Sequence, residues 1–157
     1  MPKAVMVLEA GDQFHAYAGD SGSMRRPLAS PTPHLKLHLD RFDGRNAFSG
    51  YGQGYVTLNG RQHHRSLVVF PDRIVDPWEV ARAEELDEAD LSVLAGQPLE
   101  IALIGTGDRH HMIHPGRYRA LSAARIGVEV MSTPAACRTY NILLAEGRKV
   151  AAALIVG

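Results

Sequence analysis

The chain has 157 residues, of which 45% are apolar and 22% charged, and its 17 basic and 17 acidic side chains give zero formal net charge. This composition is typical of one globular domain with a buried core. The charge balance argues against the long basic surface of nucleic-acid-binding proteins. No apolar run approaches the roughly 20 residues that cross a bilayer, so we expect no membrane insertion. A single cysteine permits no internal disulfide, and we expect a cytoplasmic protein.

Residues 1–33 are predicted to form a flexible N-terminal extension ahead of a single domain, residues 34–157. Glycine, serine and proline cluster at 19–23 and 27–33, and such stretches offer little apolar surface to bury. The N-terminus matches neither a secretory signal nor an arginine-rich transit peptide. Met24 offers an alternative start of translation.

The first half of the domain is predicted to be rich in hairpins. Residues 34–39 alternate polar and apolar side chains, which predicts a half-buried strand with its leucines facing the core. A strand at 55–58 and a second one running to Phe70 flank Asn59-Gly60, a dipeptide that supplies the positive φ values of a tight turn. A further short strand is expected at 73–75, before Trp78, which should lie in the core.

The second half is predicted to alternate strands and helices. A helix capped by Asp87 should contain Leu91 and Leu94 and end at Gly96. The elements that follow are a strand at 99–104, a helix at 115–124, a strand at 128–131, a helix at 134–146 and a strand at 150–156. Hairpins followed by such alternation predict an α/β domain with a parallel or mixed sheet.

One long segment carries a resemblance to a known family. The segment is Gly127-Val-Glu-Val-Met-Ser-Thr-Pro-Ala-Ala-Cys-Arg-Thr-Tyr-Asn141, continued by Glu146-Gly147-Arg148. The resemblance is supported by residues 54–60, by residues 103–107 and by the pair Pro71 and Trp78. With these residues the chain resembles the domain of unknown function 498 family. Its mitochondrial members act as respiratory complex I assembly factor 3, and its bacterial and archaeal members are mostly uncharacterised.

The resemblance covers residues 35–156 and implies a single compact three-layer α/β domain with a central mixed β-sheet. It also implies a non-catalytic protein-interaction or assembly-factor role, with an unidentified protein partner and no cofactor. The extension lacks a mitochondrial type of presequence, which favours a bacterial cytoplasmic relative.

The residues themselves point to a ligand site where two strand–helix loops meet. Thr133 is a good helix N-cap, and Pro134 fits the first helical position. If strands 99–104 and 128–131 are parallel neighbours, the loops after them emerge at one carboxyl edge of the sheet, where α/β proteins bind ligands. A small-anion site, and with it an enzyme, is therefore an alternative function. Its candidate residues are Gly105, Thr106, Gly107, Thr133, Arg138 and Asn141.

Each of these residues also has an ordinary structural interpretation. The glycines permit tight strand–helix packing, and Arg138 and Asn141 can belong to a local network. Cys137 near the helix start could be reactive, but the sequence supplies no base beside it, and a buried cysteine is more common. His110 and His114 have helical metal-ligand spacing, yet Pro115 disfavours a helix there. We therefore assign no catalytic residue and no metal site, and the sequence leaves enzymatic activity open while favouring a non-catalytic role.

Overall fold

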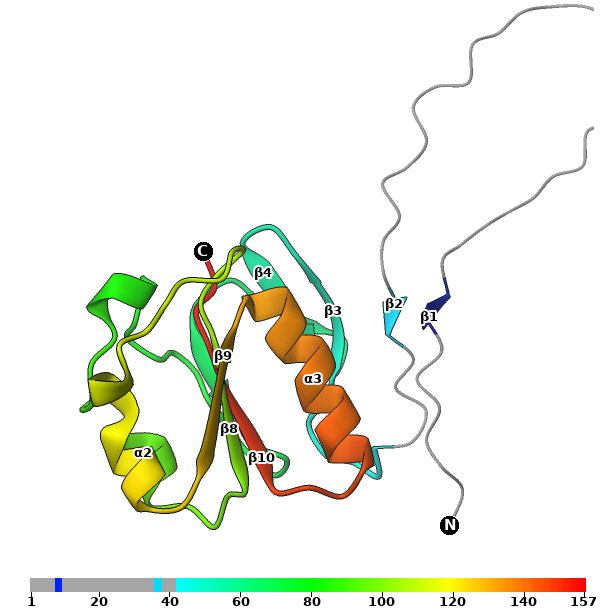
Figure 1. Ribbon diagram of the computed structural model, residues 1–157. Helices are drawn as coiled ribbons and strands as arrows, with labels where there is room; N and C mark the ends of the chain where they lie inside the picture. The colour runs from blue at the N-terminus through cyan, green and yellow to red at the C-terminus, as the bar shows by residue number, and fades with distance from the viewer. Residues whose placement is uncertain (1–7, 10–35, 38–41) are drawn as a thin grey trace, which may run out of the picture.

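The computed structural model describes residues 8–9, 36–37 and 42–157 (Figure 1). The predicted domain boundary at residue 34, Met24 and most of the predicted extension lie outside these residues. Leu8–Glu9 (β1) pairs antiparallel with Lys36–Leu37 (β2), which is the middle of the strand predicted at 34–39. Among the residues described, no helix is both long and apolar enough to cross a membrane.

A small antiparallel sheet contains β3 (Phe48–Gly52), β4 (Tyr55–Leu58) and β5 (Arg61–His63). The predicted turn between β4 and β5 is confirmed, because Asn59 has φ 50° and Gly60 has φ 82°.

The strand predicted to continue from this turn to Phe70 is wrong as one element. The polar, largely exposed β5 ends at His63, and the fully buried β6 (Leu67–Val69) belongs to a different sheet. The three consecutive apolar residues of β6 are typical of a strand that is covered on both faces. A continuation of the largely exposed β5 would leave them in contact with solvent.

The central sheet has the order β7-β6-β10-β8-β9. Its strands are β6, β7 (Ile74–Val75), β8 (Ile101–Gly105), β9 (Gly127–Met131) and β10 (Val150–Leu154). β8 runs parallel to β9 and β10, whereas β6 is antiparallel to β10 and β7, so the predicted mixed sheet is confirmed. All five residues of β10 are buried, as expected of a central strand.

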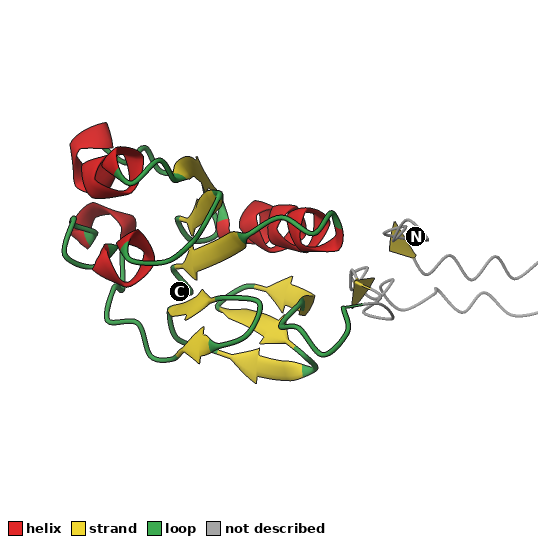
Figure 2. Cartoon of the chain, turned by 90° about the horizontal axis from the view of Figure 1, so that it is seen from below, coloured by secondary structure: helices red, strands yellow, loops and turns green. Residues whose placement is uncertain are grey.

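Two apolar clusters cover the two faces of this sheet. On one face α3 (Thr133–Ala145) and the small sheet pack together, through Tyr140 and Leu144 of the helix and Phe48 of β3. On the other face lie Trp78, Leu94 and the short helix α2 (Arg119–Ala123) with its buried Leu121. Figures 1 and 2 show α3 and α2 on opposite sides of the strands. The predicted three-layer α/β fold and the core position of Trp78 are confirmed.

Two predicted helices are shorter than expected. The acidic segment contains only a 3-10 turn, η1 (Ala83–Glu85), and α1 (Ser92–Ala95). Asp87 does not cap α1, since its carboxylate accepts hydrogen bonds from the amides of Ala89 and Asp90 and fixes a separate turn. The helix predicted at 115–124 is divided between η2 (Pro115–Tyr118) and α2, because Tyr118 has the non-helical angles φ −121° and ψ 22°.

Candidate functional site

The two loops expected to form a site are adjacent. β8 and β9 are parallel neighbours in which Gly105 is paired with Met131. The amide of Thr133 donates to the carbonyl of Gly107 (2.7 Å), and the amide of Gly107 donates to Oγ1 of Thr133 (3.0 Å). The structure therefore brings Gly105, Thr106, Gly107 and Thr133 together at the carboxyl edge of the sheet, with these two amides engaged inside the protein.

Thr133 is not the N-cap of α3, contrary to the sequence prediction. Ser132 has the extended backbone of a cap, and its hydroxyl accepts from the amide of Ala135 (3.4 Å). Helical backbone begins at Thr133, so Pro134 takes the second helical position. The buried hydroxyl of Thr133 instead donates to the carbonyl of Ile155 (2.7 Å), which ties the helix to the segment directly after β10.

Gly105 is required by close packing between β8 and the start of α3. A Cβ atom on this residue would lie 2.7 Å from Cδ2 of Leu154 and 2.8 Å from Oγ1 of Thr133. Both contacts are shorter than van der Waals distance, and Leu154 is fully buried. This geometry supports the structural interpretation of the glycine.

Thr106 organises the loop that follows β8. Its Oγ1 lies 2.7 Å from the carbonyl of Arg109 and 3.1 Å from that of Met131, and it accepts from the amide of His111 (3.0 Å). The side chain is buried, with 3% exposed, so these loop contacts replace its hydration.

The side-chain hydrogen bonds of Arg138 and Asn141 go to β3 and not to the loops. Oδ1 of Asn141 accepts from the amide of Phe48 (2.9 Å), and its Nδ2 donates to the carbonyl of Phe48 (2.8 Å). The amide group thus pairs with the strand as a neighbouring backbone would. Nη1 of Arg138 donates to the hydroxyl of Tyr51 (2.6 Å), with the guanidinium 5.5 Å from the ring centroid. Both residues join α3 to the small sheet.

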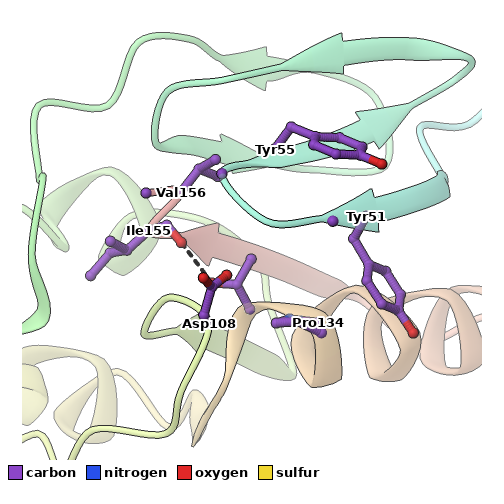
Figure 3. Close-up of a pocket in the computed structure, with 10 residues that line it drawn as sticks. Tyr51, Tyr55, Asp108, Pro134, Ile155 and Val156 are labelled. Carbon is purple, nitrogen blue, oxygen red and sulfur yellow. Dashed lines mark hydrogen bonds between the residues drawn. The ribbon is translucent and has the colours of Figure 1, made fainter. Parts of the chain in front are cut away.

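A shallow hollow lies where the β3–β4 turn, the start of α3 and the segment after β10 meet (Figure 3). It encloses about 210 Å³ of empty space, part of it open to solvent. Of the predicted site residues only Thr133 lines it, with Tyr51, Gly52, Gly54, Tyr55, Asp108, Pro134, Ile155, Val156 and Gly157.

The start of α3 offers the hollow few free donors for an anion. Pro134 has no N–H group, and the amide of Ala136 donates to the carbonyl of Ser132 (2.9 Å). Asp108 adds a carboxylate beside the helix start, where the helix dipole favours negative charge. The sequence analysis overlooked Asp108 and both tyrosines, although the position of Asp108 directly after Gly107 was a usable signal. A small-anion site here stays a prediction.

The other chemically reactive side chains are buried or hydrogen-bonded within the protein. Cys137 is completely buried, as expected, and desolvation raises the pKa of its thiol. Burial likewise raises the pKa of Tyr140, whose hydroxyl donates to the carbonyl of Asn46 (3.0 Å). Nδ1 of His114 accepts from the amide of Gly116 (3.1 Å) at the start of η2. Within the described part of the chain, no three His, Cys, Asp or Glu side chains are grouped as metal ligands.

Comparison with known proteins identifies the family. Residues 48–155 match the family described as protein of unknown function (DUF498/DUF598). The chain belongs to this family, as the segment at 127–148 predicted.

Relatives of the chain occur in animals and in bacteria. It is 33% identical over 123 residues to the NADH dehydrogenase [ubiquinone] 1 alpha subcomplex assembly factor 3 of Bos taurus, covering 77% of this chain and 61% of the relative. It is 36% identical over 114 residues to an uncharacterized protein of Rhodobacter capsulatus, covering 73% and 87%. A crystal structure from Bordetella parapertussis matches with a TM-score of 0.69 and 39% identity, covering 73% of this chain and 98% of that one. The chain spans about three-fifths of the length of its bovine relative.

Proposed function

We propose that this protein acts without catalysis, through contacts with other proteins, and assists the assembly of a multiprotein complex. The observation that carries the proposal is the 33% identity over 123 residues to a relative named as an NADH dehydrogenase assembly factor. The finer proposal is that the assembled complex is the respiratory NADH dehydrogenase and that the protein acts in the cytoplasm.

The contacts of the chemically reactive residues support a role of this kind. The thiol of Cys137 is buried, the amide of Asn141 is paired with β3, and the hydroxyl of Thr133 is bonded to Ile155. Each of these groups stabilises the fold, and a substrate would have to break a buried hydrogen bond or a packed core to reach it. Interaction through the outer surface needs no such rearrangement.

Affinity capture tests the proposal. The tagged full chain is recovered from cells of its source with mild detergent, and co-purified proteins are quantified against an untagged control. We expect subunits of NADH dehydrogenase to be enriched reproducibly. Recovery of no reproducible protein partner would contradict the interaction role, and recovery of a different complex would contradict the finer proposal.

The small-anion alternative has its own test. Thermal unfolding is followed with inorganic phosphate, nucleotides and organic acids. A ligand that raises the melting temperature of the wild type but not of Arg138→Ala would favour the alternative, whereas no shift with any compound would count against it.

A further inference from the structure

β9 is an edge of the central sheet. Among the described strands its only neighbour is β8, and Figure 1 shows it running between α2 and α3. No residue of β9 is fully buried, in contrast to the central strand β10. An open strand edge is a template for pairing with another extended segment.

The hydrogen-bonding groups on the open side can be assigned from the ladder. The amide of Gly127 donates to the carbonyl of Glu100 (2.9 Å), and the carbonyl of Met131 accepts from the amide of Thr106 (2.9 Å). These two residues therefore direct their backbone groups toward β8. Since the direction alternates along a strand, the N–H and C=O groups of Val128 and Val130 point away from the sheet.

The side chains of β9 combine apolar surface with one charge. Val128 and Val130 pack on the α2 face of the sheet, and Met131 packs on the α3 face. Alternation places Glu129 on the α3 face with Met131, and Glu129 is exposed. None of the ion pairs between described residues uses its carboxylate.

A second copy of this chain is a poor occupant of the edge. The outward backbone N–H and C=O groups of Val128 and Val130 would form hydrogen bonds with the same groups of the other copy. The antiparallel register that pairs all of these groups is centred on Glu129. That register sets the two Glu129 carboxylates directly opposite each other on one face, where like charges destabilise a strand pair. A segment with a cation at the same position would make an attractive pair.

We propose that β9 is a docking edge to which a protein partner adds an extended segment, with a lysine or arginine opposite Glu129 and apolar residues on both sides of it. The pairing uses the backbone groups of Val128 and Val130, while the side chain of Met131 lies beside Glu129 on the α3 face. The inference rests on the proposed function, since it names the surface and the chemistry of the protein partner.

A peptide tests this chemistry directly. The probe is a fluorescent peptide with the core Leu-Val-Lys-Val-Phe and Gly-Ser flanks, which places lysine opposite Glu129 in either strand direction. The comparison peptide carries glutamate at the centre. We expect the wild type to bind the lysine peptide about three- to tenfold more tightly, and Glu129→Lys to reverse this preference. Glu79→Lys, an exposed charge reversal beyond β7 at the opposite edge, is the matched control and should leave the preference unchanged.

A second variant and a second measurement separate docking from simple charge attraction. Val130→Pro removes an outward N–H group but no hydrogen bond to β8, so it should weaken binding at least fivefold. Hydrogen exchange should slow at the amides of Val128 and Val130 when the lysine peptide is bound. Equal affinity for both peptides, no binding to the wild type, or an unchanged preference in Glu129→Lys would overturn the proposal.

The docking edge and the proposed function can fail separately. If Glu129→Lys and Val130→Pro still recover the partner of the wild type, the docking edge is wrong and the interaction function stands. If the wild type itself recovers no partner, the proposed function fails whatever the peptides show.

Discussion

Replacing Asn141 by alanine should destabilise the protein strongly, although this residue was first identified as a candidate ligand-binding group. Its side chain is 2% exposed and forms two hydrogen bonds, of 2.9 and 2.8 Å, with the amide and carbonyl of Phe48. Phe48 itself is fully buried, so alanine would leave one donor and one acceptor without partners. Each such group costs about 1–3 kcal/mol, which gives a loss of about 2–6 kcal/mol for the two. That is a large part of the roughly 5–15 kcal/mol by which domains are stable.

Urea unfolding followed by circular dichroism measures this change as the difference in free energy of unfolding. The matched control is Ile142→Ala, the next residue of α3, whose side chain is 43% exposed and should cost at most about 1 kcal/mol. A loss below about 1 kcal/mol in Asn141→Ala, or a loss equal to that of the control, would refute the assignment of Asn141 to the joint between α3 and β3.

Three further changes test the start of α3 and the core beneath it. Gly105→Ala should cost about 1–3 kcal/mol in urea unfolding, since its new Cβ would lie 2.7 Å from Leu154, whereas Gly96→Ala, with no atom within 4 Å, should cost nothing measurable. Thr133→Val should destabilise by about 2–6 kcal/mol because the Gly107 amide and the Ile155 carbonyl both lose their partner, and Thr133→Ser should retain most of the stability. Burial raises the pKa of the Cys137 thiol in the folded state. The stability that the protonated thiol contributes is therefore fully present below its unfolded pKa of about 8.5, and it is lost as the pH rises toward the folded pKa. The wild type should therefore lose about 1.4 kcal/mol more than Cys137→Ala between pH 7.5 and 9.5, and equal losses would contradict this.

The second half of the fold was largely predictable because its signals are local. The strand at 99–104, the helix starting near Pro134 and the strand beginning at residue 150 agree with β8, α3 and β10 within one or two residues. Each element has an apolar run of suitable length and a turn or cap beside it. The sequence could not show that Ser132 is the N-cap in place of Thr133. The Thr133 hydroxyl is hydrogen-bonded to Ile155, a residue outside the helix, and no local pattern indicates that partner.

The hairpin half shows where local pattern is insufficient. The turn at Asn59-Gly60 follows from dihedral preference alone, and it is present. The transfer of β6 to the central sheet depends on β10, which lies more than 80 residues further along the chain. The spacing of polar and apolar residues within 61–70 therefore cannot show which sheet β6 joins.

The meeting of the two loops was predictable from the sequence, but the hydrogen-bond partners of the groups in them were not. Parallel pairing of β8 and β9 explains why Gly107 and Thr133 meet. Whether hydrogen-bond donors stay free for a ligand depends on partners far away in the sequence. Asn141, for example, is paired with Phe48, 93 residues away. The open edge of β9 depends on strand order in the same way, although the single carboxylate in Gly127-Val-Glu-Val-Met131 was a visible signal of exposure.

Depletion of the protein in cells that contain NADH dehydrogenase tests the central claim, a role in complex assembly, most directly. Native gel electrophoresis of solubilised membranes, stained for NADH oxidation, separates the mature complex from its subassemblies. The account predicts that depletion lowers the mature complex and accumulates subassemblies, and that the wild-type chain restores both. Unchanged amounts of the mature complex, with no accumulated subassembly, would contradict it.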